Sequence, residues 1–94
     1  MIDEAQLREF KSQWRELELN VVGMVKTEDG SWAAAEGLDT PPVAYDAILI
    51  GRNPSQDRFD ILDLAEDVPR NQAVKAAKQA AKLLKISVHH IVIR

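Results

Sequence analysis

The sequence predicts an α+β fold in which one mixed sheet has a helix packed on it. Three observations lead to this prediction. A segment with helical periodicity lies near each end of the chain, short apolar runs bounded by turn signals lie between them, and a run rich in β-branched residues follows the second helix. The 94 residues are the length of one small domain, with ordinary apolar and charged fractions of 46% and 29%. We therefore expect one compact domain over 1–94, in the order helix, three or four strands, helix, strand.

The first helix is expected over 3–18. Its apolar residues recur at spacings of three, four and three, which places them on one side of a helix. They are Leu7, Phe10, Trp14 and Leu17. Asp3 is expected to cap the helix, with Gln6 three residues later as its capping-box partner.

A strand is expected over 19–27, followed by a turn at 28–30, where Gly30 supplies positive φ. A short return strand is expected over 31–36. Its Trp32 would be exposed on this hairpin, where an aromatic side chain can anchor a partner or cover the edge of the core.

A connector is expected over 38–42, and a hairpin of two strong strands is expected after it. The strands cover 43–51 and 58–65, with a turn at 52–56. The alternative for 57–66 is a helix, because short apolar runs are ambiguous in period. That alternative would remove the central strand.

The clearest helix covers 69–85, with Pro69 in its first turn and Asp67 as its cap. One half of this helix is apolar and contains Val74, Ala76, Ala77, Ala80, Ala81, Leu83 and Leu84. Four lysines lie on the other side: Lys75, Lys78, Lys82 and Lys85. A final strand is expected over 86–93, parallel to its predecessor as in a βαβ unit.

Charge is divided unevenly along the chain. All 15 acidic residues and six of the basic ones lie in 1–67, whereas 68–94 contain six basic residues and no acid. The four lysines of the second helix, extended by Arg70, could bind a phosphate backbone. The alternative is that the lysines form a solvated helix face and the basic helix packs beside an acidic sheet.

Several classes of function are excluded or disfavoured. The chain has no cysteine, so it has no disulfide and no thiolate chemistry. No apolar stretch approaches the ~20 residues of a membrane span, and the acidic N-terminus does not resemble a signal peptide, so we expect a cytoplasmic protein. His89 and His90 are adjacent on the expected final strand, where they would point to opposite faces and could not share a metal.

The element order and two stretches, AYDAILI at 44–50 and FDILDLA at 59–65, resemble the core of the PD-(D/E)xK nuclease superfamily, the restriction-endonuclease-like fold. The resemblance implies Mg²⁺-dependent hydrolysis of phosphodiesters, with Asp46 and Asp63 as the catalytic, metal-binding acids. Ala65 stands where the family has its catalytic lysine, and Tyr45 stands where it has a proline. These departures count against catalysis.

Two functions from different classes follow. The first is a non-enzymatic interaction protein without a cofactor, which binds a protein through its acidic sheet surface or self-associates through an edge strand. In size and charge it is similar to phage and mobile-element proteins, including inhibitors of host defence and immunity proteins. The alternative is a nucleic-acid-binding protein on a nuclease-like core, either degenerate or still dependent on Mg²⁺.

Overall fold

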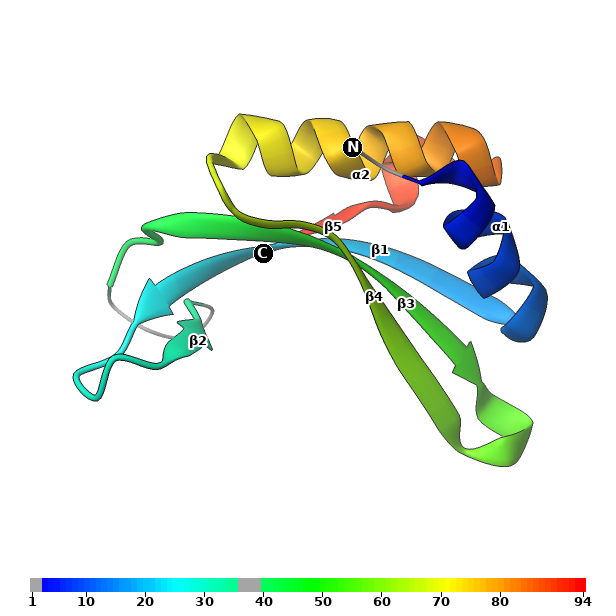
Figure 1. Cartoon of the computed structure of the whole chain (residues 1–94), viewed down its shortest axis with the longest axis horizontal. Coiled ribbons are helices and arrows are strands. Elements are labelled where there is room, and N and C mark those ends of the chain that lie inside the picture. The colour runs from blue at the N-terminus through cyan, green and yellow to red at the C-terminus, as the bar shows by residue number, and fades with distance from the viewer. Residues whose placement is uncertain (1–2, 36–39) are drawn as a thin grey trace.

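Two helices cover one face of a five-stranded sheet and leave the other face uncovered (Figure 1). The computed structural model describes residues 3–35 and 40–94. Helix α1 spans Glu4–Gln13 and helix α2 spans Arg70–Leu84. The predicted α+β fold, a sheet with a helix packed on it, is confirmed.

The sheet has the strand order β2-β1-β3-β4, in which all neighbours are antiparallel. The short strand β5 pairs with β1 in parallel, so the sheet is mixed. The strands are β1 (Glu16–Lys26), β2 (Trp32–Ala34), β3 (Ala44–Asn53), β4 (Arg58–Val68) and β5 (Val92–Ile93). Strand β4 forms one edge of this arrangement, and β2 and β5 lie at the other edge.

Helix α1 begins as predicted but ends early. The Asp3 side chain accepts hydrogen bonds from the backbone N–H groups of Ala5 and Gln6, which confirms the cap. The helix ends at Gln13, so the prediction of a helix to residue 18 is wrong. The reason is the alternation of Glu and Leu over 16–19, which suits a strand and pairs with β3 in regular register.

The hairpins form largely where the sequence predicts them. Gly30 has a φ of 87° at the first turn, and β2 returns antiparallel to β1. Residues 36–39, where the return strand and the connector were expected to meet, lie outside the described residues. Asp57 closes the turn and residues 58–66 belong to strand β4, so the helical alternative for 57–66 is wrong.

Helix α2 is confirmed, but its predicted cap is not. Pro69 occupies the N-cap position, whereas Asp67 lies in β4 with a left-handed φ of 54°. The backbone N–H of Asp67 donates to Asp46 Oδ1, so this residue is bound to the sheet and does not cap the helix. The buried side of α2 is mostly alanine, which lets the helix lie close to the sheet.

The expected final strand over 86–93 is mostly wrong. A 3₁₀ turn occupies Val88–His90, and only two residues form β5. The Ser87 side chain accepts the His89 backbone N–H and stabilises the turn against an extended conformation. Strand β5 runs parallel to β4, as predicted, but it lies at the far side of β1 and not beside β4.

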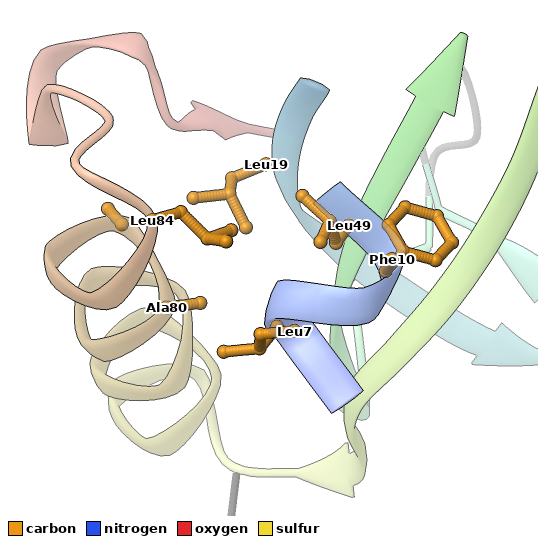
Figure 2. Packing of buried hydrophobic residues seen from close by; sticks show 7 residues of the cluster. Leu7, Phe10, Leu19, Leu49, Ala80 and Leu84 are labelled. Atoms are coloured by element: carbon orange, nitrogen blue, oxygen red, sulfur yellow. The ribbon is translucent and has the colours of Figure 1, made fainter. Parts of the chain in front are cut away.

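The main core lies between the helices and the covered face of the sheet (Figure 2). Leu7 of α1, Leu19 of β1 and Leu49 of β3 are almost completely buried there, against the alanines of α2. A second cluster continues it toward the start of α2, around Val21 and Ala47. Both clusters lie on the covered side of the sheet.

Candidate functional site

The sheet face opposite the helices carries apolar side chains that no other element of the described chain covers. Leu19 and Val21 of β1 and Ala47 and Leu49 of β3 point into the core. Because successive side chains of a strand point to opposite sides, their neighbours point away from the helices. We call this surface the uncovered face. Its apolar residues are Val22, Met24, Ile48, Ile50, Phe59 and Ile61.

Exposure increases toward the edge strand β4. Phe59 and Ile61 are 68% and 46% exposed. The register places Ile61 beside Ile50 and Phe59 beside Arg52, so these side chains continue the row from β3. The exposed apolar residues therefore form one strip and are not scattered singly, which distinguishes them from ordinary surface hydrophobics.

The uncovered face is concave. Figure 1 shows both ends of the sheet, at β2 and at the β3–β4 turn, bending away from the helices. Trp32 of β2 and Glu66 of β4 line one pocket of about 150 Å³. On a flat sheet these strands would be three spacings apart, about 14 Å. A shared pocket requires the sheet to curl toward this side.

That pocket is acidic. Its floor is formed by Met24 and Ala44, Trp32 lies at one side, and carboxylates lie at the other; we call it the acidic pocket. The carboxylates belong to Asp46, Glu66 and Asp67.

Two irregularities in the β3–β4 pairing bring the carboxylates together. Three consecutive pairs of the ladder match Tyr45, Ala47 and Ile48 of β3 with Val68, Ala65 and Asp63 of β4. Strand β4 thus has extra residues here, and β-bulges of this kind redirect side chains. The carboxylate of Glu66 consequently lies beside Asp63.

The carboxylates repel one another. A hydrogen bond with Asp63 raises the pKa of Glu66, and the negative charges of Asp63 and Asp46 raise it further. Protonation of one carboxyl relieves the repulsion, as in other close carboxyl pairs. A cation placed among them would relieve it in the same way.

The other end of the uncovered face is neutralised within the chain. Arg52 Nη1 lies 2.7 Å from Glu18 Oε2, and the Asn20 amide donates to Glu18 Oε1 at 2.9 Å. The hydrogen bond from Asn20 has the largest effect on the pKa of Glu18 and lowers it, and the hydrogen bond from Arg52 lowers it further. The unbalanced negative charge of this face is therefore concentrated at the acidic pocket.

The two acids implied by the nuclease resemblance lie on adjacent strands. Asp63 pairs with Ile48, so it shares the uncovered face with Asp46 on the adjacent strand. Among the described residues, no group of three or more His, Cys, Asp or Glu side chains has a geometry that could hold a metal ion. Mg²⁺ is nevertheless satisfied by one or two protein carboxylates with waters, so Asp46 and Asp63 are the residues that would hold it.

The predicted basic residues lie on the opposite side of the molecule. Arg70, Lys75, Lys78 and Lys82 are exposed on α2, and Lys85 follows as its C-cap. In the part of the chain that the structure describes, none of them belongs to an ion pair. Ala65 stands where the nuclease family has its catalytic lysine. Because α2 packs on the covered face, its lysines do not lie beside Asp46 and Asp63 and cannot take the place of that lysine.

The remaining predicted residues are placed as follows. Trp32 is 48% exposed on β2, as expected for the hairpin. His89 and His90 lie in a 3₁₀ turn and are exposed, so the prediction that they alternate across a strand is wrong. Glu66 and Met24 were not predicted as site residues, because only the bulges and the curl of the sheet bring them into the pocket.

No family model, curated protein or solved structure matches the chain. Among the residues that the structure describes, no helix is both long enough and apolar enough to cross a membrane.

Proposed function

We propose that this chain is a non-enzymatic interaction protein that binds a protein partner through the uncovered face. The observation that carries the proposal is the concave strip of apolar side chains, half-buried in β3 and open to solvent at Phe59 and Ile61. A strip of this kind, bordered by charged groups, is typical of protein-binding surfaces. An inhibitor or immunity-like protein acts in this way, by occupying a surface of its target.

The charge of this face favours a protein over a nucleic acid. Four carboxylates, those of Asp46, Asp63, Glu66 and Asp67, would oppose the approach of phosphate groups. Catalysis has less support than binding, because no basic side chain of α2 stands on the side of Asp46 and Asp63.

The test removes the apolar side chains and follows the bound partner. The double variant Phe59→Ser and Ile61→Ser serves as bait in cell extracts, beside the wild-type chain. Val88→Ser is the matched control, because Val88 is 48% exposed but lies in the 3₁₀ turn after α2. Each captured protein is then purified and its affinity for each bait is measured.

We expect the wild type and Val88→Ser to bind the same protein with equal affinity. The double variant should bind at least tenfold more weakly, because exposed aromatic and aliphatic anchors each contribute roughly 1–2 kcal/mol or more. Equal affinity of all three baits would refute the proposal. If each bait recovers only further copies of this chain, sedimentation of the three proteins shows whether self-association uses the same face.

A second candidate, nucleic-acid binding, has one observation in its favour: Lys75, Lys78 and Lys82 form an exposed row on α2. The check is binding and cleavage of labelled single-stranded, duplex and branched nucleic acid with Mg²⁺ at two salt concentrations. Loss of salt-sensitive binding when the three lysines become Glu would establish it. Cleavage that Asp63→Asn abolishes would restore the nuclease hypothesis.

A further inference from the structure

We propose that the occupant of the uncovered face is a partner helix that places one arginine or lysine side chain in the acidic pocket. This inference rests on the proposed function and specifies the chemistry of the partner.

The curl of the sheet favours a helix as the occupant of the uncovered face. A flat apolar sheet face packs well against another sheet, but two concave faces cannot meet along their centres. A helix with its side chains is a convex cylinder of about 10–12 Å in diameter. It can lie along the concave side of the curved sheet (Figure 1), where Ile48, Ile50 and Ile61 share the uncovered face. Helices of partners commonly bind in apolar grooves in this way.

The acidic pocket lies at one end of the concave side and favours a cationic side chain there. Its carboxylates have no cationic partner among the described residues, whereas Glu18 at the opposite end is already bound by Arg52. The volume of about 150 Å³ is several times the ~30 Å³ share of one water molecule, so the end of a long basic side chain fits. Complementary charge at one end of an apolar groove fixes the direction in which a helix binds.

Trp32 adds a second contact for the cation. Its side chain lines the acidic pocket opposite Asp46 and Glu66. The face of an indole ring attracts a cation, and a guanidinium group also stacks on it. Exposed aromatic residues beside carboxylates therefore favour arginine over an apolar side chain at this end.

The probe is a designed 14-residue peptide, acetylated and amidated, with leucines along one side of the helix and a single arginine near one end. The matched peptide has citrulline in place of arginine, which keeps the shape and removes the charge. Binding to the ¹⁵N-labelled chain is followed by chemical shifts, including the Trp32 indole N–H, which Trp32→Phe identifies. The variants are Glu66→Gln with Asp46→Asn, and Val88→Ser as the control.

We expect the arginine peptide to bind about tenfold more tightly than the citrulline peptide, from an ion pair and a cation–π contact of modest strength. The preference should disappear in the Glu66→Gln, Asp46→Asn variant and remain in Val88→Ser.

Other results separate this inference from the proposed function. Equal binding of both peptides at the uncovered face would overturn the cation in the pocket but keep the helix. If neither peptide binds while Phe59→Ser, Ile61→Ser still loses its captured partner, the helix is wrong and the proposed function stands. If that double variant keeps its partner, the proposed function itself fails.

Discussion

At the scale of single residues, the contact between Trp14 and Gly51 determines how α1 meets the sheet. A Cβ at Gly51 would lie 2.8 Å from Trp14 Cβ and 2.6 Å from its Cδ1. Both atoms are near the backbone of Trp14, so the side chain cannot move away by rotating its far end. The glycine is required here for close approach and not for its φ.

We therefore expect Gly51→Ala to lower the free energy of unfolding by about 1–3 kcal/mol, the usual cost of overpacking. Denaturant unfolding of the purified variant measures the change. In a Trp14→Ala background the same substitution should cost clearly less, since Cγ and the indole ring are gone and only Cβ remains near Gly51. An equal cost in both backgrounds would show that the Trp14 contact is not the cause.

Site residues placed by regular strand alternation could be predicted from the sequence, whereas the residue placed by the bulges could not. Asp46 and Asp63 were expected on the two strands of one hairpin, as the acids implied by the nuclease resemblance, and the register places them on one face of adjacent strands. Glu66 could not be found in this way, because strict alternation over 63–66 would send it to the opposite side from Asp63. Bulges depend on the pairing partner, which the local sequence does not contain.

At the scale of elements, helix α2 ends on a strained residue. Lys85 has a left-handed φ of 60°, and its N–H and that of Ile86 bind back to carbonyls of the last turn, including Ala81 O. This arrangement is a Schellman motif, in which glycine is the preferred residue at the left-handed position.

Lys85→Gly should raise the free energy of unfolding by about 1 kcal/mol, because a residue with a Cβ pays roughly that amount in the left-handed region. Thermal and denaturant unfolding measure the gain. Lys85→Ala separates the effects of backbone and charge, since it removes the ammonium but keeps the Cβ. A gain of equal size in the alanine variant would contradict the backbone explanation.

The elements themselves were predicted with unequal success. The alanine-rich period of α2 and the apolar runs of β3 and β4 on either side of a turn are strong local signals, and they were correct. The predictions for the end of α1 and for the 86–93 segment were wrong, because contacts outside the local pattern decide both. Pairing with β3 decides where α1 ends, and the Ser87 side-chain cap decides the turn at 88–90. In β1, pairing with β3 extends the strand back to Glu16 at the expense of the helix.

At the scale of the whole molecule, charge is separated between two sides. The carboxylates of the acidic pocket lie on the uncovered face, whereas the lysines of α2 lie on the covered side. The sequence showed this asymmetry only as two segments of opposite charge. It could not show that the carboxylates of the acidic pocket and the lysines of α2 lie on opposite faces of the sheet, which is what prevents the lysines from neutralising the acidic pocket.

The repulsion in the acidic pocket should make stability depend on pH. The pKa of Glu66 is raised in the folded state by its hydrogen bond to Asp63 and by the charges of Asp63 and Asp46. Between its ordinary value of 4.5 and the raised value, the folded state binds more protons than the unfolded state. Stability therefore falls as pH rises through this window, and the loss is complete above it.

We expect Glu66→Gln to be more stable than the wild type at neutral pH and to differ least from it below pH 4.5, where Glu66 is protonated in both states. Denaturant unfolding between pH 3 and 8 measures both profiles, and added salt should reduce the difference. A variant less stable than the wild type at neutral pH would show that Glu66 is stabilising as an anion.

The position of β5 has a consequence for the order in which the chain folds. Strands β1, β3 and β4 form a meander of near neighbours, but Asn20 pairs with Val92, which lies 72 residues later. Closing so long a loop for a two-residue strand is entropically costly, so this pairing should form last. It should also open first in native-state hydrogen exchange, which would release the amide of Gly23 from the Arg94 carbonyl. The middle of β1 then has backbone groups that are temporarily unpaired along one edge, while the core beneath α2 stays closed.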